Sequence, residues 1–393
     1  MRLNKVFTIF LVSFQLWFLY ATPISSISVA DAILILMYPV LLFKLIKEKK
    51  MYLSKNNLPL VLFLVYIFFQ FILVFSINDI SFVNEAALRT GRYVLYLITV
   101  IFIAPNFFEV KLGIKVLKYI CIASTIFLFF QILMVRFAGV YIPGTIPGLP
   151  LIRLDLLEFN QNIMNAGYLI RPRSFFSEPA HYATYVLLYL GIGLFSEKKK
   201  IIDYFPEIII TFGLLVSNSA TGFIACAIVW GVWAFKKLLL NEKKTKFIIA
   251  TLLLTPFLLF LIVNTEYYQT FVFRVFGEGS GGLGTAAASR MENYDLAFST
   301  DGLSTIEILF GHGMVDTAYY MPSIPTIFFY FGIIGMLVFF IFSLMIMHNG
   351  NEKQKIIIIL TIVLSIGGDA IFGPNCLYFY LFLLSPKTTK KLE

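Results

Sequence analysis

The residues best suited to chemistry lie where the chain passes from a hydrophilic segment into an apolar run. They read Arg171-Pro-Arg173-Ser-Phe-Phe-Ser-Glu178-Pro-Ala-His181. Proline favours the first turn of a helix, so we expect Glu178 at the positive end of that helix, where its anion is stabilised. Arginine keeps its charge and binds phosphate oxygens through paired hydrogen bonds, which suits a pyrophosphate at a membrane surface. The alternative interpretation is that these groups only anchor a membrane helix.

A second group of polar residues lies further along the chain. Ser289-Arg290-Met-Glu-Asn-Tyr-Asp-Leu-Ala297 is predicted to form a short helix, and Phe310-Gly-His312-Gly-Met-Val-Asp316 follows it. Glycines on both sides of His312 allow a tight turn that presents the imidazole. A histidine in a polar loop is nevertheless more often incidental than catalytic. The motif Gly332-Ile-Ile-Gly335, which comes next, is explained by close packing of two helices.

Two further polar sites interrupt apolar runs. Asn218, Ser219 and Thr221 form a predicted turn, and turn formation and helix capping account for most of it. Asp369 falls in a turn that is expected to dip into the membrane, where an acidic side chain is a functional candidate. The sequence has no Walker A loop, no CxxC pair, no HExxH and no dinucleotide fingerprint. We therefore expect neither a cofactor nor a metal.

Composition indicates the elements that must position these residues. Hydrophobic residues make up 59% of the chain and charged residues only 13%, far from the balance of a soluble domain. With 43 Phe and 21 Tyr, the bilayer is the natural solvent. The net charge of +9 comes from short lysine-rich connections, so it does not indicate nucleic-acid binding. The three cysteines lie inside apolar runs and imply no disulfide framework.

The apolar runs predict an all-α, polytopic membrane protein of about twelve spans, since a span takes roughly 20 residues. The predicted runs are Val6–Tyr20, Val29–Leu45, Leu58–Ile77, Tyr93–Phe107, Ile114–Val135, Pro179–Phe195, Ile201–Val216, Ala220–Phe235, Phe247–Val263, Met321–Met347 and Ile356–Leu384. The last run is too short for two full helices but has to cross twice, so its turn at Gly367–Pro374 is expected to be re-entrant. The first run is alternatively a cleaved signal peptide.

The basic residues predict the orientation, because they are retained on the cytoplasmic side. All 22 lysines fall on alternate connections and at the termini, which places both termini in the cytoplasm. Only one of the nine arginines, Arg2, shares that side. The others fall outside or at the outer rim: Arg89, Arg92, Arg136, Arg153, Arg171, Arg173, Arg274 and Arg290.

We expect residues 1–393 to form a single transmembrane domain with two large external loops, 137–178 and 264–320. The second loop is acidic and contains a glycine-rich stretch, Gly277–Gly284. That stretch is either a mobile lid or a disordered connector.

The order of these parts resembles the bacterial O-antigen polymerases (Wzy-type) and the related O-antigen ligases. The likeness runs from about Arg171 to Gly335. It rests on Arg173–Pro179, the polar turn Asn218–Gly222, the arginine-led helix Arg290–Ala297, Gly311–Gly313 and the Gly-x-x-Gly span. The ligases carry a catalytic histidine eleven positions before the first glycine of that span. Met321 stands there, followed by Pro322, which counts against a ligase.

The resemblance implies a GT-C-like membrane glycosyltransferase. It would polymerise undecaprenyl-pyrophosphate-linked repeat units of O-antigen, capsule or exopolysaccharide at the external, periplasmic face of the cytoplasmic (inner) membrane. Its partners would be lipid-linked oligosaccharides, membrane lipid and, where one exists, a chain-length regulator protein. On this basis Arg171, Arg173 and Arg290 bind pyrophosphate, while His181, Ser219 and Thr221 contact substrate. Glu178 is the first candidate for the base or an orienting group, and His312 and Asp316 are the second.

A lipid-linked oligosaccharide flippase or another transporter is the main alternative. Transporters tend to have paired halves and broken helices with charges at mid-membrane. Apart from Asp369, the charges outside the lysine-rich connections are gathered in two loops on one face. This distribution favours chemistry at a surface.

Overall fold

The computed structural model describes residues 2–24, 27–48, 57–77, 80–152, 170–197, 200–240, 293–299, 302–315 and 320–384. Within these ranges the regular structure is helical, with two isolated β-bridges, Tyr20 to Leu151 and Ala21 to Ser28. The all-α prediction is confirmed. The predicted span 247–263 and the glycine-rich stretch 277–284 lie outside the described residues.

Six helical segments of the described chain are long and apolar enough to cross a membrane, as expected of a multi-pass membrane protein. They are Val29–Glu48, Leu58–Ser76, Val83–Phe107, Val110–Ala138, Ala220–Lys237 and Ser323–Asn349. They correspond to α2 (Val29–Glu48), α3 (Leu58–Ile77), α4 (Ile80–Ile98) with its continuation through η2 (Thr99–Ile103) and α5 (Ala104–Phe107), α6 (Val110–Ala138), α10 (Ala220–Leu240) and α15 (Ser323–Asn349). The predicted count of about twelve stays a prediction.

Several predicted spans are shorter helices. They are α1 (Arg2–Trp17), α8 (Pro179–Leu194), α9 (Phe205–Val216, preceded by the 3-10 turn η3, Ile201–Tyr204), α16 (Glu352–Gly367) and α17 (Gly373–Leu383); α14 (Thr305–Phe310) is shorter still. With a rise of about 1.5 Å per residue, α17 is only roughly 16 Å long. The last apolar run therefore folds as two short helices with a turn between them, as its length predicts.

The outer surfaces of the long helices are apolar. Leu36 and Ile46 on α2 are 75% and 73% exposed, and many other large apolar side chains on α3, α6 and α15 are also exposed. A water-soluble monomer rarely exposes so much continuous apolar surface, whereas a protein surrounded by lipid does. These faces therefore suit a bilayer.

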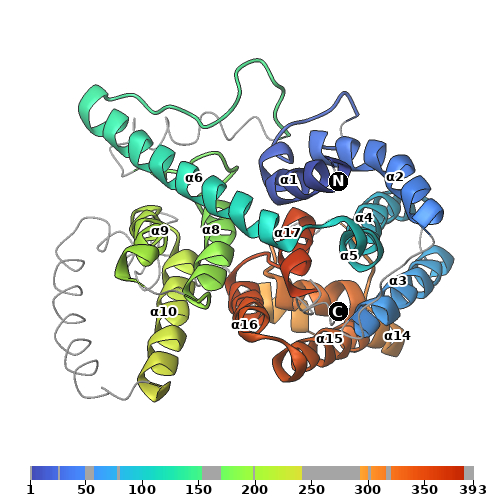
Figure 1. Ribbon diagram of the computed structural model, residues 1–393. Coiled ribbons are helices and arrows are strands. Elements are labelled where there is room, and N and C mark those ends of the chain that lie inside the picture. Colours follow the sequence, from blue (N-terminus) through green and yellow to red (C-terminus); the bar gives the residue numbers. More distant parts are fainter. Residues whose placement is uncertain are drawn as a thin grey trace. The chain divides into compact units, whose positions relative to one another are not determined.

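The described contacts fall into two compact units. Unit 1 comprises residues 1–120, 145–153 and 292–393, and unit 2 comprises residues 121–144 and 154–291. In unit 1, α17 lies against α1, α4 and α16 (Figure 1) and is buried from Asn375 to Leu383. Phe14 of α1 packs edge-on against Tyr96 of α4, with ring centroids 5.4 Å apart. The first apolar run is thus part of the core of unit 1.

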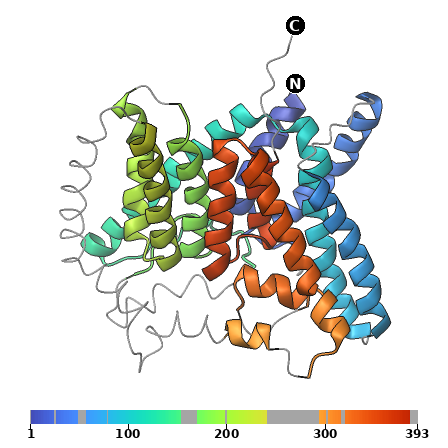
Figure 2. The same ribbon diagram turned by 90° about the horizontal axis from the view of Figure 1, so that it is seen from below.

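Helix α15 is broken at Gly332, whose backbone is left-handed (φ 61°, ψ −161°). A Cβ at this position would lie 2.4 Å from the backbone of Leu309, so glycine lets the end of α14 pack against the break. Figure 2 shows the two pieces of α15 running in different directions. The Gly-x-x-Gly motif therefore does allow a close approach, but through a break in the helix rather than along a straight one.

Unit 2 is built from the second half of α6 with α8, α9 and α10, and Figure 2 shows these last three helices side by side. Helix α8 is buried from Tyr182 to Leu194. Tyr182 forms a hydrogen bond with Thr125 of α6, at 2.8 Å. Gly222 of α10 allows a close approach to Ala183, because a Cβ on Gly222 would lie 2.6 Å from that of Ala183. The N-terminal turns of α8 and α10 therefore lie side by side.

Candidate functional site

The arginine-rich segment folds back on itself just before α8. Arg173 is only 3% exposed, and its Nη1 donates to the carbonyl oxygens of Ser177 at 3.0 Å and Phe176 at 3.4 Å. Among the described residues its Nε and Nη2 have no hydrogen-bond partner, although both are buried. Arg171 is half-buried two residues earlier. A buried cation with donors to spare is a strong attractor for an oxyanion.

Ser174 fixes the position of this segment. Its backbone is left-handed (φ 54°), which is uncommon for a residue other than glycine. The strain is offset by two hydrogen bonds to α6: its N–H donates to Gln131 Oε1 at 2.9 Å, and its hydroxyl donates to the carbonyl of Ser124 at 2.6 Å. A Cβ on Gly144 would clash with the carbonyl oxygen of Ser174. Arg173 is therefore held rigidly.

Three polar side chains stand at the start of α8. Glu178 is the residue before the first helical position, as predicted, and Pro179 occupies that position. Glu178 is half-buried, and its side chain does not cap the helix through a hydrogen bond. Ser177 is hydrogen-bonded through Oγ to Nδ1 of His181, one turn into the helix. Sequence reasoning did not assign a role to Ser177.

The predicted polar turn lies next to the arginine segment. Asn218 is left-handed (φ 57°), and its amide lies 3.5 Å from the carbonyl of Ile170, the residue before Arg171. Ser219 caps α10, because its hydroxyl accepts the N–H of Gly222 at 3.2 Å. Thr221 is half-buried in the first turn of α10. The turn does cap a helix, and it also abuts the segment that carries Arg171 and Arg173.

Unit 2 thus brings together six of the nine residues that the sequence proposed as a site: Arg171, Arg173, Glu178, His181, Ser219 and Thr221. The positive ends of two helices, α8 and α10, lie side by side there, and the guanidinium group of Arg173 lies just before α8. Arg290 and Asp316 lie outside the described residues, so their predicted roles stay predictions. His312 belongs to unit 1.

His312 lies in the predicted tight turn, and both flanking glycines are left-handed (φ 73° and 85°). The turn docks on the break in α15: the N–H of His312 donates to the carbonyl of Phe329 at 2.8 Å, and that of Gly313 to Tyr330 at 3.0 Å. The imidazole packs on the Phe329 ring, and its Nδ1 lies 3.6 Å from Glu307 Oε1. Burial lowers the pKa of His312, and Glu307 only partly opposes this.

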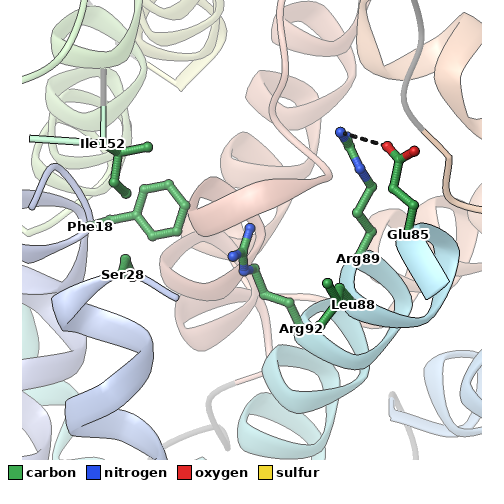
Figure 3. Close-up of a pocket in the computed structure, with 7 residues that line it drawn as sticks. All are labelled: Phe18, Ser28, Glu85, Leu88, Arg89, Arg92 and Ile152. Atoms are coloured by element: carbon green, nitrogen blue, oxygen red, sulfur yellow. Dashed lines mark ion pairs between the residues drawn. The ribbon is translucent and has the colours of Figure 1, made fainter. Parts of the chain in front are cut away.

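Unit 1 also contains two arginines that sequence reasoning left unassigned. Arg89 and Arg92 lie within α4, which begins well before the predicted start of its span at Tyr93. Arg89 pairs with Glu85 at 3.3 Å, and Arg92 Nε lies 3.3 Å from Asp31 Oδ2. Both arginines line a hollow of about 340 Å³. Figure 3 shows Phe18, Ser28 and Ile152 on the side of this hollow opposite the arginines. Arg89 and Arg92 are three residues apart, a spacing that places two side chains on the same face of a helix. This spacing was the sequence signal that could have identified them as a pair.

A second hollow, of about 200 Å³, shares Arg89 and Arg92 with the first. It is lined by Arg89, Arg92, Tyr93, Tyr96, Met314, Tyr330, Asp369, Phe372 and Gly373. Asp369 Oδ1 accepts hydrogen bonds from the hydroxyl of Ser323 and the N–H of Phe372, both at 3.0 Å. The turn that carries Asp369 therefore faces the arginines of α4.

No protein-family model, curated protein or solved structure matches this chain. A function has to follow from its own side chains and their surroundings. Within the described residues, no group of three or more His, Cys, Asp or Glu side chains could hold a metal ion. What unit 2 offers instead is a fixed positive site with a carboxylate and an imidazole beside it.

Proposed function

We propose that the chain is a membrane glycosyltransferase that polymerises polyprenyl-pyrophosphate-linked oligosaccharide repeat units at the outer face of the cytoplasmic membrane. The observation that carries the proposal is the buried Arg173, which has two unpartnered donor atoms and is hydrogen-bonded to the carbonyls of Phe176 and Ser177, just before the N-terminus of α8. Fixed donors and helix ends of this kind stabilise a phosphate-type charge without having to reorganise. The likeness to O-antigen polymerases supplies the substrate class.

In the proposed reaction, a hydroxyl of the acceptor glycan attacks the anomeric carbon of the donor sugar. The new bond joins that oxygen to the anomeric carbon, and the bond to the lipid pyrophosphate breaks. Arg171 and Arg173 compensate the charge that develops on the departing pyrophosphate. Glu178, or His181 oriented by Ser177, accepts the hydroxyl proton. The sugar–pyrophosphate bond already holds the energy for the transfer.

A flippase is the second candidate, because broken helices such as α15 are typical of transporters. The carbonyl groups at this break are, however, occupied by protein donors. Those of Phe329 and Tyr330 accept from the His312 turn, and Tyr66 donates to Phe331 at 2.7 Å. They are not directed toward a passing ion or substrate. A ligase-like transferase is a weaker alternative, since Met321 stands where ligases have histidine.

The proposal is tested by measuring polymer formation from lipid-linked repeat units in membranes containing the protein. We expect Glu178→Gln to slow polymerisation about 100-fold, as loss of an acid–base group does. Glu197→Gln is the matched control, because Glu197 is exposed beyond the other end of α8. We also expect Arg173→Lys to slow the reaction about 100-fold, while Arg136→Lys, at an exposed arginine, leaves it unchanged.

The leaflet at which substrate accumulates separates the two candidate functions. Deletion of a polymerase leaves single repeat units on the surface glycan. Deletion of a flippase leaves lipid-linked units on the cytoplasmic leaflet. Normal polymer made by the Glu178→Gln and Arg173→Lys variants would refute the site.

A further inference from the structure

The hollow of about 200 Å³ in unit 1 has no role in the site of unit 2. Its size is that of several water molecules, at roughly 30 Å³ each, which is room for one sugar ring. Aromatic side chains line much of its wall. The rings of Tyr93 and Tyr330 lie 5.3 and 5.5 Å from that of Phe372, measured between centroids. The aromatic wall is therefore one connected surface.

Charged groups of both signs line the same hollow. Arg89 and Arg92 come from α4, and Asp369 comes from the turn before α17. Asp369 is held in place, because its Oδ1 accepts from Ser323 and from the N–H of Phe372. Ser323 is fully buried, and it also accepts the N–H of Ala370 at 3.0 Å. The carboxylate is thus presented by a rigid turn.

This mixture of charges disfavours two kinds of ligand. An apolar ligand would remove water from three charged groups without forming hydrogen bonds to them. A bare phosphate would meet Asp369, and the nearby Asp31 and Glu85 already lie 3.3 Å from the two arginines. A neutral polyol avoids both the uncompensated loss of water and the repulsion between anions. Its hydroxyl groups donate to a carboxylate and accept from guanidinium groups, while its C–H face packs on aromatic rings.

We propose that this hollow binds one sugar ring of a glycan, with Asp369 and the α4 arginines on its hydroxyl groups and the aromatic wall under its C–H face. The larger hollow, which shares Arg89 and Arg92 with it, takes the adjoining sugar. The identity of this glycan rests on the proposed function: it is the sugar part of a lipid-linked repeat unit, bound through carbohydrate and not through pyrophosphate.

The probe is the oligosaccharide that mild acid releases from the prenyl-pyrophosphate-linked glycans of the producing cells, labelled at its reducing end. Binding is measured to the full-length protein in lipid nanodiscs. We expect Met314→Trp, which fills the smaller hollow, and Asp369→Asn each to weaken binding at least tenfold. Met347→Trp is the matched control, because Met347 is an exposed methionine on α15. Arg173→Lys should leave probe binding unchanged.

A measurement on the wild-type protein tests the sugar site even if a variant does not fold. Saturating probe should slow hydroxyl-radical oxidation of Met314 and Tyr330, both of which line the hollow. Unchanged oxidation, or wild-type binding by a folded Met314→Trp variant, overturns the sugar site while leaving the polymerase proposal standing. Polymerisation that survives Glu178→Gln and Arg173→Lys overturns that proposal instead, whatever the probe does.

Discussion

At the residue scale, the placement of Arg173 works against folding. A buried donor left without a partner costs about 1–3 kcal/mol, and Arg173 has two such atoms among the described residues. Unit 2 nevertheless fixes the residue through the left-handed Ser174 and its hydrogen bonds to α6. An anion bound at this point would satisfy the spare donors. The proposed function therefore gives these donors a partner that an anchoring role does not supply.

His312 carries a prediction about pH. Burial lowers its pKa in the folded protein below the ordinary value of about 6.5. The unfolded chain therefore binds the proton more readily, so stability is full above pH 6.5 and falls as the pH drops below it. We expect the thermal unfolding midpoint of the wild type to decline over this range more steeply than that of His312→Gln. Equal pH profiles would contradict a buried, neutral imidazole.

The titration of Glu307 does not interfere with this measurement of thermal stability against pH. Its hydrogen bonds with Ser304 lower its pKa below the ordinary value of a glutamate. Its contribution to stability is lost only as the pH falls through that lower range. The difference between the wild type and His312→Gln, compared at pH 8 and pH 5, therefore reports the imidazole.

The sequence predicted residues of the site where a local rule applied. Proline after Glu178 marked the start of a helix, and the glycines around His312 marked a turn. No role for Arg89 and Arg92 follows from the sequence, because the apolar run begins at Tyr93 while the helix begins at Ile80. Asp31, which pairs with Arg92, and Asp369, which lines a hollow together with both arginines, are distant from them in sequence, and only tertiary packing brings them near.

At the element scale, the break in α15 organises its surroundings in unit 1. A straight helix would satisfy its own carbonyl groups, whereas this break offers them to other elements. The His312 turn takes two of them, Tyr66 donates to Phe331, and Gln70 of α3 donates to Tyr330 at 3.0 Å. Hydropathy could not predict this, because the run from Met321 to Met347 is apolar on both sides of Gly332. Glycine permits a positive φ but does not require it.

Gly332→Ala tests the importance of the break. The substitution places a Cβ at a left-handed position and 2.4 Å from the backbone of Leu309. We expect a loss of at least about 2 kcal/mol in unfolding free energy, measured by denaturation in detergent. Gly231→Ala on α10 is the control, since a Cβ there meets nothing within 4 Å. It should be neutral or slightly stabilising. Equal stability of the two variants would argue against a rigid break.

At the scale of the whole molecule, the chain forms two units whose segments alternate along the sequence. Composition predicted helices and membrane burial, because those follow from total apolar content. It could not predict the division into units, which depends on which helices pack together. The distribution of lysine and arginine along the chain nevertheless predicts the same orientation for both units. The ends that carry arginine should face the outside of the cell.

That statement is tested by labelling single cysteines in intact cells. The native Cys121, Cys226 and Cys376 are buried, so replacing them with alanine leaves the exposed surface of the protein nearly unchanged. We expect a membrane-impermeant maleimide to label Ile24→Cys in unit 1 and Val140→Cys in unit 2, both exposed positions on the predicted outer side. Lys47→Cys and Lys237→Cys, exposed on the lysine side, should react only after permeabilisation, because lysine-rich connections are retained in the cytoplasm. The opposite pattern in unit 2 would place Arg173 and Glu178 in the cytoplasm, away from any external glycan, and would remove the basis for an outer-face polymerase.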